Sequence, residues 1–277
     1  MHEDALVGLQ VKAGYVLGSF DPSRYVASPS GANELDFEED LFGAVRVLDR
    51  GQIALLVPIV ETWRRSETFG TSGGGVEQSG AGGGVGDVNV SARYDLTIAG
   101  SSLIVPGVAA LVGFTVPTGK PPEAAGAGSL EANATDLGVY QINAGLAIEN
   151  AFGPWLVNAT AVLAVRTART VGTGVNAVHE RLAPQWTFLL AVAYAFPNDW
   201  AAALSASYAA EGDATINGAE ALLSSRRLPT LSLSGVMPLS DTWRVQCALF
   251  DNPPISSVGF GQPADAGLSL TMIRSWL

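Results

Sequence analysis

Polar and apolar side chains alternate with a period of two residues in segment after segment of this chain. In residues 87–97 every second position is polar, and the positions between them are apolar. The polar set is Asp87, Asn89, Ser91, Arg93, Asp95 and Thr97, and the apolar set is Val88, Val90, Ala92, Tyr94 and Leu96. A β-strand turns successive side chains to opposite faces, so this pattern predicts strands with one polar and one apolar face. No segment of comparable length follows the helical period of about 3.6 residues.

The alternation repeats in about twelve segments, most of them ten to fifteen residues long. They cover residues 5–17, 34–48, 52–64, 86–98, 107–116, 138–150, 155–166, 182–196, 200–209, 227–239, 243–251 and 266–276. Strands in soluble sheets usually have about five or six residues. A tilted strand needs about nine to eleven residues to cross the apolar layer of a membrane, so these lengths favour membrane-spanning strands.

The composition supports the same interpretation. Hydrophobic residues make up 48% of the chain, charged residues make up 15%, and the mean hydropathy is +0.27. Soluble proteins usually contain about 25% charged residues. The chain nevertheless has no uninterrupted apolar run of about 18 residues, which a helix would need to span a membrane. A hydrophobic average without a hydrophobic helix is typical of a transmembrane β-barrel.

The connections between the predicted strands alternate between long and short. The short ones are 49–51, 99–106, 151–154, 197–199 and 240–242, and the long ones are 18–33, 65–85, 117–137, 167–181, 210–226 and 252–265. Bacterial outer-membrane barrels have short periplasmic turns and long outer loops. We therefore predict an all-β fold in which residues 1–277 form a single domain, a transmembrane antiparallel up-and-down β-barrel of about 12 strands. We expect it in the outer membrane of a Gram-negative-type bacterium, with both termini periplasmic and the first strand paired with the last.

Net charge and cysteine content exclude several classes of function. Fifteen basic residues against 26 acidic ones give a net charge of −11, so a polyanion would be repelled and we expect no nucleic-acid partner. The single cysteine, Cys247, cannot form an internal disulfide or a cysteine-rich metal site. An outer-membrane barrel must first cross the inner membrane, so we expect Met1 to stand in place of a removed leader.

Charged side chains on the polar face of the predicted strands should line the lumen. The candidates for lumen lining and selectivity are Glu34, Asp36, Glu38, Asp40, Arg46, Arg93, Asp95 and Arg244. The four acids of the second strand could select cations or bind a divalent ion at a pore mouth. They could instead belong to a solvated wall and pair with Lys12, Arg46 and Arg93 of neighbouring strands, and we favour this wall. We predict no resident metal and no cofactor, and we expect Glu39, which breaks the alternation, to mark a bulge.

All six tryptophans lie at or near predicted strand ends: Trp63, Trp155, Trp186, Trp200, Trp243 and Trp276. Rings with one polar edge prefer the boundary between membrane and water, so we expect these side chains to anchor the barrel at its interfaces. Core packing near strand ends is the alternative. Residues 70–86 contain nine glycines and little apolar surface, so we expect this loop to be mobile.

Catalytic motifs are weak in this chain. Residues 82–86 resemble a phosphate-binding loop and residues 117–120 resemble half of a Walker motif, but neither lies between a parallel strand and a helix. We interpret both as structural. There are two histidines, His2 and His179, and no serine or aspartate is placed to single it out as the partner of His179. We therefore expect a protein that is not an enzyme.

Short motifs along the chain together resemble one family. They are Gly84-Val85-Gly86-Asp87-Val88, Arg93-Tyr94, Pro117-Thr118-Gly119-Lys120, Phe250-Asp251, Gly259-Phe260-Gly261 and Arg274-Ser275-Trp276. In this order they resemble the outer-membrane β-barrel transporter family named for the meta-pathway of phenol degradation. The resemblance implies a barrel that passes aromatic or other hydrophobic compounds, and it implies no catalytic residue. Such barrels usually end in an aromatic residue, whereas here Trp276 is penultimate and Leu277 is last.

Two functional hypotheses follow. In the first, the barrel is a porin-like passive transporter that takes up small, aromatic or hydrophobic molecules, with selectivity set by wall charges and loops. In the second, the barrel does not transport and instead anchors or docks a larger cell-envelope assembly through its outer loops. The expected partners are outer-membrane lipid, a small-molecule solute and, under the second hypothesis, envelope proteins.

Overall fold

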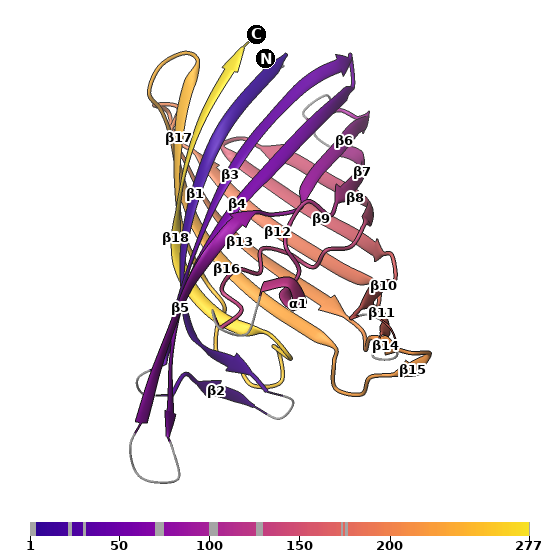
Figure 1. The fold of residues 1–277 in the computed structure, drawn as a ribbon. Coiled ribbons are helices and arrows are strands. Elements are labelled where there is room, and N and C mark those ends of the chain that lie inside the picture. The colour runs from indigo at the N-terminus through magenta and orange to yellow at the C-terminus, as the bar shows by residue number, and fades with distance from the viewer. Residues whose placement is uncertain are drawn as a thin grey trace.

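The computed structural model describes residues 4–21, 24–29, 32–69, 75–99, 105–125, 130–172, 174 and 177–276. Its main sheet has 14 strands, of which β2 and β5 extend the sheet and the other 12 form a closed antiparallel barrel (Figure 1). The barrel strands are β1 (Ala5–Phe20), β3 (Asn33–Leu48), β4 (Gly51–Phe69), β6 (Val88–Thr97), β7 (Gly107–Val116), β8 (Gln141–Phe152), β9 (Trp155–Arg166), β12 (Gln185–Ala195), β13 (Ala201–Glu211), β16 (Arg226–Pro238), β17 (Trp243–Asp251) and β18 (Pro263–Trp276). Each predicted segment corresponds to one of these strands, so the predicted all-β barrel is confirmed.

The barrel closes between its first and last strands, as predicted. The β1–β18 ladder runs from Ala5 opposite Trp276 to Ser19 opposite Pro263. The two termini therefore lie side by side at one end of the barrel (Figure 1). We call this end, which also holds the short connections between strands, the turn end, and the opposite end the loop end. Closure gives the first and last strands the hydrogen-bond partners that an open sheet edge would lack.

Large apolar side chains cover the outer face of the barrel. Leu204, Leu249 and Ile142 are each 61% exposed, and the same holds at alternate positions of most strands. The buried apolar residues of the described chain are mostly alanines, such as Ala109, Ala147, Ala164 and Ala264. A soluble domain does the reverse and buries its large apolar side chains. This surface is therefore suited to an apolar surrounding medium.

The glycine-rich segment is a strand rather than the mobile loop that we predicted. Strand β5 (Gly75–Val85) pairs with β4 from Phe69 opposite Gly75 to Ile59 opposite Val85, and the hairpin extends beyond the barrel at the loop end (Figure 1). The prediction failed because backbone pairing with β4 needs no side chains. Residues 70–74 of the predicted loop lie outside the described residues.

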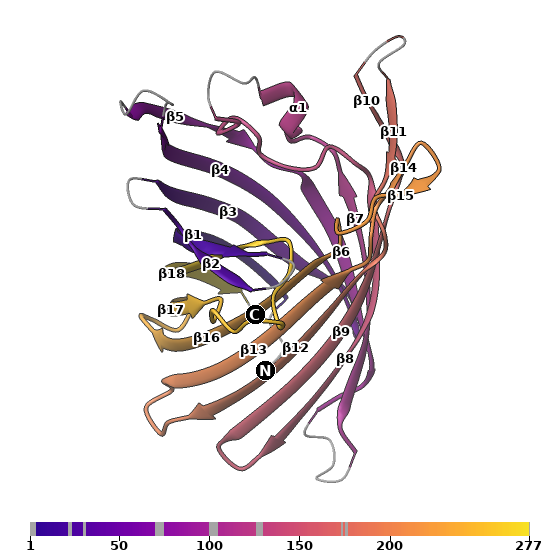
Figure 2. The same cartoon turned by 90° about the horizontal axis from the view of Figure 1, so that it is seen from below.

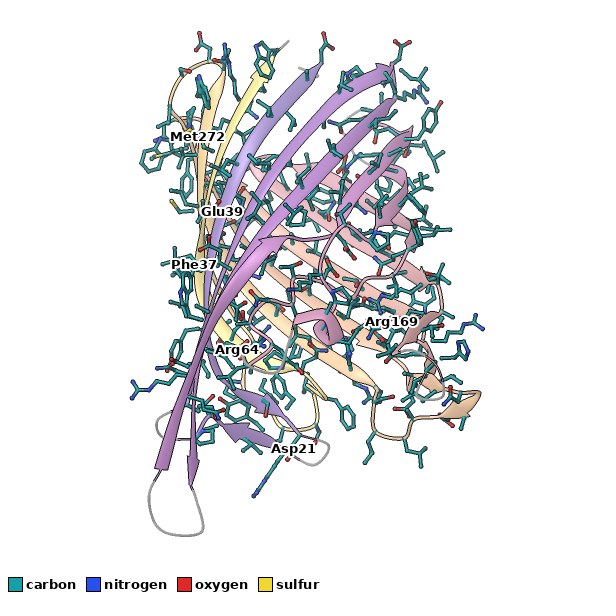
Figure 3. The ribbon with its side chains drawn as sticks, in the orientation of Figure 1. Asp21, Phe37, Glu39, Arg64, Arg169 and Met272 are labelled. Atoms are coloured by element: carbon teal, nitrogen blue, oxygen red, sulfur yellow. The ribbon has the colours of Figure 1, made fainter. Side chains whose placement is uncertain are left out.

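Glu39 does not mark a bulge. The ladders run through it without a shift, opposite Val11 on β1 and Ile59 on β4. Register shifts occur elsewhere, between Arg46 and Leu48 of β3 among other places. Glu39 is exposed and shares the outer face with Phe37 (Figure 3). The break in alternation is therefore a carboxylate on the outer face of a regular strand.

Several short strands and one short helix lie at the loop end. Strand β2 (Tyr25–Ala27) pairs with β1, and a separate sheet contains β10 (Arg169–Val171), β11 (Val178–Arg181), β14 (Thr215–Ile216) and β15 (Ala219–Glu220). Helix α1 (Pro122–Ala125) lies beside β4 and β5 when the barrel is seen from below (Figure 2). In the described residues, no helix is long and apolar enough to cross a membrane.

Closure depends on a close approach at Gly267. A Cβ added there would lie 2.0 Å from the carbonyl oxygen of Ala13 and 2.5 Å from the Phe250 ring, whereas one added at Gly235 would meet nothing nearer than 3.9 Å. We therefore expect Gly267→Ala to destabilise the barrel by about 1–3 kcal/mol, the usual cost of overpacking, and Gly235→Ala to have little effect. Heat-modifiable gel mobility in detergent measures both. Equal melting temperatures for the two variants would contradict a tightly packed seam.

Candidate functional site on the inner wall of the barrel

The charged side chains that the sequence singled out lie on the face of their strands opposite to the exposed apolar side chains. On β3 the exposed large residues Leu35, Leu41 and Val45 occupy odd positions, so the acids at even positions share the inner face. Arg93 and Asp95 lie on the inner face of β6, opposite to exposed Val90 and Tyr94, and Arg244 lies near the turn end of β17. The charged residues at even positions of β3 are Glu34, Asp36, Glu38, Asp40 and Arg46.

The four acids of β3, Glu34, Asp36, Glu38 and Asp40, form an acidic row that contacts cations on the neighbouring strands. Arg64 on β4, which is labelled in Figure 3, lies 2.8 Å from Glu34. Lys12 on β1 lies 3.6 Å from Glu38. The Lys12 ammonium group also lies 4.8 Å from the centre of the Phe250 ring, where the ring's negative face attracts it. Pairing with Lys12 was predicted, and Arg64 was missed because its strand was expected to end at residue 64. The row is thus bound into the wall by charges on neighbouring strands.

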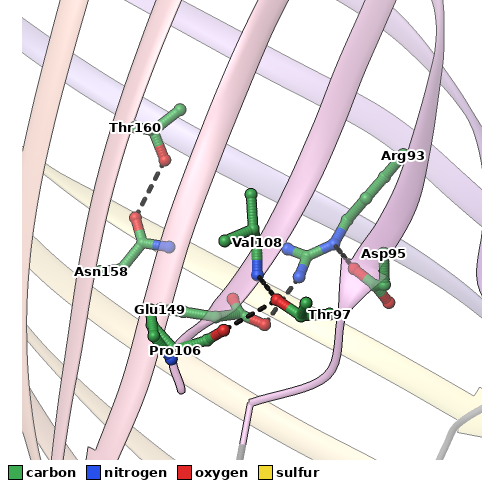
Figure 4. A network of polar contacts seen from close by, with 8 residues as sticks. All are labelled: Arg93, Asp95, Thr97, Pro106, Val108, Glu149, Asn158 and Thr160. Carbon is green, nitrogen blue, oxygen red and sulfur yellow. Dashed lines mark hydrogen bonds and ion pairs between the residues drawn. The ribbon is translucent and has the colours of Figure 1, made fainter. Parts of the chain in front are cut away.

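The predicted pairing of Arg93 with the acidic row is wrong. Its guanidinium group contacts Asp95 at 2.8 Å and Glu149 at 2.7 Å (Figure 4). Arg46, at the turn end of the row, contacts Asp4 at 3.6 Å and donates a hydrogen bond to the carbonyl oxygen of Asp49. Among the described residues, no group of three or more His, Cys, Asp or Glu side chains is arranged to hold a metal ion.

A second arginine cluster on the inner wall was not foreseen. Arg166, whose side chain is 6% exposed, donates hydrogen bonds to Gln141, Gln185 and Glu211, with 2.5 Å to the Glu211 carboxylate. These residues come from β8, β9, β12 and β13, and the ion pair reaches across β12. Arg166 occupies a position at which the alternating pattern of its strand predicts an inward-facing side chain, so the sequence could have identified it. Glu211 lies beyond the predicted end of its strand, so its partner could not be recognised.

The tryptophans are divided between the two ends of the barrel. Trp155, Trp200, Trp243 and Trp276 lie at the turn end, and Arg274 stacks on two of them, 5.6 Å from Trp243 and 4.9 Å from Trp276. Trp186 lies at the loop end of β12, and Trp63 lies toward the loop end of β4. Trp63 is a correction, because β4 continues to Phe69 and this ring is inside the strand, packed edge-on against Phe37. Five of the six positions thus adjoin a strand end.

Strand β4 changes its pairing partner where residues 86 and 87 connect β5 to β6. Residues 51–56 of β4 pair with β6, whereas residues 59–69 of β4 pair with β5, which follows β4 away from the barrel. Strand β7 pairs with β6 as far as Val116, which lies opposite Val88, and its described residues do not pair with β5. The connection from β7 to β8 occupies the place beside β5. We call its described part, residues 117–125 and 130–140, the inner strap.

Two sequence motifs meet where the strap joins the wall. Thr118 donates a hydrogen bond to the carbonyl oxygen of Gly86 at 2.6 Å and accepts one from the Val88 amide at 3.0 Å. The Gly119 amide donates to Asp87 at 2.7 Å, and the Asp87 amide donates to Asp136 at 3.1 Å. These contacts join residues 84–88 to residues 117–120. The phosphate-loop look-alikes are therefore structural, as we interpreted them.

Glycines in β5 make room for the strap. A Cβ added at Gly82 would lie 2.2 Å from the side-chain oxygen of Asn133 and 2.7 Å from the backbone nitrogen of Asn133. Thr135 donates a hydrogen bond to the carbonyl oxygen of Val85 at 2.8 Å. Farther along β4, Arg64 donates to the carbonyl oxygen of Leu130 at 3.0 Å. The glycine-rich strand thus lets another segment pack on it and does not act as a flexible linker.

Asp87 is the titratable group at the centre of this junction. It is 6% exposed, and it lies between β5 and β6, outside both strands. Burial raises the pKa of its carboxyl group to about 6, the Gly119 amide opposes that shift, and the neighbouring Asp136 carboxylate adds to it. The protonated form of Asp87 is therefore favoured in the folded protein relative to the unfolded chain.

Hollows on the inner wall lie between these polar groups. One of about 250 Å³ is bordered by Gln52, Arg93, Leu111, Asn143 and Val162. Another of about 310 Å³ lies nearer the turn end and is bordered by Glu149, Asn158, Ala191 and Ala193. Each combines small or apolar side chains with an amide and a charged group. Such linings fit small molecules that have an apolar body and a polar substituent.

In the part of the chain that the structure describes, the His179 ring has no hydrogen bond to a serine or a carboxylate. Its Nδ1 atom lies 3.0 Å from the hydroxyl group of Thr170 on the neighbouring strand β10. Its backbone amide donates to Asn217. The surroundings are those of a small exposed sheet at the loop end.

Comparison with known proteins yields matches in fold. No family model and no curated protein matches this sequence. An outer membrane channel from Pseudomonas putida F1 superposes with a TM-score of 0.71 over 100% of this chain and 97% of that one, at 14% identity. The transport unit of the autotransporter AIDA-I from Escherichia coli superposes with a TM-score of 0.53 over 98% of this chain and 90% of that one, at 11% identity. The chain therefore shares the fold of outer-membrane barrels.

The raised pKa of Asp87 predicts how pH affects the junction. A carboxyl group that titrates at about 6 when folded and 3.8 when unfolded binds more protons in the folded state, so its contribution to stability grows as pH falls through about 6 and levels off below about 4. Asp87→Asn mimics the protonated form. We expect this variant to melt above the wild-type protein at pH 7.5 and by a clearly smaller margin at pH 5, because the two proteins become equally stable only below about pH 4.

Thermal melts in detergent at the two pH values measure this difference. Asp241→Asn, at an exposed turn, is the matched control and should show no pH-dependent difference. A D87N variant that melts below the wild-type protein at pH 7.5 would contradict the raised pKa.

Proposed function

We propose that this protein is an outer-membrane β-barrel channel through which small molecules pass passively. The proposal takes residues 1–277 as one barrel domain, with the turn end and both termini on the periplasmic side. Its support is the closed barrel with large apolar side chains outside and charged side chains inside, which suits lipid on one face and water on the other. The Pseudomonas putida F1 structure that shares this fold is an outer membrane channel.

The observation that carries the proposal is the set of hollows on the inner wall. The volumes of about 250 and 310 Å³ lie along the side formed by β4, β6, β7, β8, β9 and β12. Their mixed linings favour small solutes with an apolar body, and the resemblance to the phenol meta-pathway family supports aromatic or hydrophobic compounds. The tryptophans near both ends would anchor the barrel at the membrane boundaries.

The acidic row would set the preference of such a channel for ions. Within the described ranges, the ion pairs of these four carboxylates are those with Lys12 and Arg64, so this part of the wall carries excess negative charge. A ring or row of carboxylates favours cations in a water-filled pore. Glu39 provides a matched control, because it lies on the same strand and on the outer face.

Planar-bilayer recordings of the purified protein test the proposal. We expect steady, salt-dependent single-channel current with a preference for cations. The double variant Asp36→Asn, Asp40→Asn should shift the reversal potential toward anions, and Glu39→Gln should leave it unchanged. The absence of current from protein whose heat-modifiable mobility proves a folded barrel would overturn the channel.

The loop end supports a second candidate function. The β4–β5 hairpin and the sheet of β10, β11, β14 and β15 extend from the barrel at that end and form surfaces that a pore does not need (Figure 1). We infer from them an alternative role as a non-transporting anchor for an envelope assembly. Current in bilayers without stably co-purifying partners favours the channel. A silent barrel that retains partners, and loses them when the hairpin is shortened, favours the anchor.

A further inference from the structure

A third hollow on the inner wall lies at the loop end. Its volume is about 180 Å³, and it is bordered by Arg166, Gln185, Glu211, Arg226, Leu228 and Gln262. The residues come from β9, β12, β13, β16 and the connection that precedes β18. Polar and cationic side chains dominate this lining, unlike the linings of the two hollows nearer the turn end.

The buried ion pair in this hollow is internally balanced. Glu211 accepts the hydrogen bond of Arg166 at 2.5 Å, and both side chains are almost fully buried, at 6% exposed for Arg166 and 4% for Glu211. Gln185 gives its carbonyl oxygen to Arg166, so its amide NH₂ group is left to donate elsewhere. Burial of two charges is tolerated only when they are paired in this way.

Arg226 differs from Arg166 in its side-chain contacts. It stands opposite Glu211 in the β13–β16 ladder, but the Glu211 carboxylate is bonded to Arg166. Among the residues that the structure describes, Arg226 forms no ion pair and no side-chain hydrogen bond, although it is only partly exposed. Arg93 on β6 and Arg166 on β9 each have a carboxylate within 2.7 Å. Arg227, which also borders the hollow, lies 5.9 Å from the centre of the Phe260 ring. The hollow therefore has a net positive charge and surplus donors.

We infer that this hollow binds the carboxylate of a small organic acid of about benzoate size. The inference rests on the proposed channel function and names a solute class for it. A guanidinium group presents parallel N–H donors that match the two oxygens of a carboxylate, and the amide of Gln185 adds a further donor. A cavity of about 150 Å³ accommodates benzene, so about 180 Å³ is enough for an aromatic ring with its carboxylate against Arg226.

The wall opposite the hollow also favours a solute whose carboxylate points toward Arg226. In the circle of 12 strands, β12 lies six positions from β3, so the hollow faces the wall that carries the acidic row. An anion that enters from the loop end is repelled by that row and attracted by Arg226. The two walls therefore direct the carboxylate of a solute toward β13 and β16 and leave its apolar part in the lumen.

Calorimetric titration of the full-length protein in detergent tests the site with benzoate as the probe. We expect saturable binding of benzoate and no comparable binding of benzamide, its neutral isostere. Arg226→Gln should weaken benzoate binding about tenfold to hundredfold, as expected for loss of a charge-assisted pair, and Arg226→Lys should have an intermediate effect. Arg244→Gln removes the same charge from the wall at the turn end and should change the affinity less than about twofold.

The outcomes separate this site from the channel itself. Equal affinity for benzoate and benzamide, unchanged binding by Arg226→Gln, or no benzoate binding at millimolar concentration overturns the site. The comparison of benzoate with benzamide uses wild-type protein and therefore holds even if a variant does not fold. Bilayer current measured on the same preparations tests the channel independently, because binding in detergent does not require conduction.

Discussion

Every backbone N–H and C=O group in an apolar medium needs a partner within the protein, and the rest of this structure depends on that constraint. The pairing of β1 with β18 satisfies it by converting an open sheet into a closed barrel. Closure then fixes the faces: apolar side chains such as Leu204 and Leu249 point outward, and the paired charged side chains share the interior, whereas Glu39 is a carboxylate on the outer face. Inside, they are tolerable because they pair, as Arg93 does with Asp95 and Glu149.

The inner strap shows how the wall accommodates a strand that leaves it. Where β5 follows β4 away from the barrel, the strap replaces the missing neighbour with side-chain and turn hydrogen bonds from Thr118, Gly119 and Thr135. The glycines of β5 are the condition for this packing, since a side chain at Gly82 would collide with Asn133. Motifs 84–88 and 117–120, two of the six motifs behind the family resemblance, thus contact each other.

The alternation of polar and apolar residues was sufficient to locate all twelve barrel strands, because a period of two is a direct consequence of strand geometry. Closure was expected on a separate ground, the cost of an open sheet edge in lipid. The alternation could not foresee β5, since a glycine-rich segment has no alternating side chains to reveal its pairing. It identified the inner position of the acidic row but missed Arg64 and the Arg166–Glu211 pair, whose members lie at or beyond the expected strand ends. Pairing across an intervening strand depends on register and barrel curvature, which a single sequence does not encode locally.

The central claim is that this barrel presents its apolar face to lipid and its charged face to an aqueous lumen. A spin-label scan of residues 186–193 on β12 in liposomes tests it most directly, after replacement of the exposed native Cys247 by serine. The account predicts high oxygen accessibility at the even positions 186, 188, 190 and 192, and high accessibility to a water-soluble nickel reagent at the odd positions 187, 189, 191 and 193. Uniform access of the nickel reagent to all eight positions would contradict it.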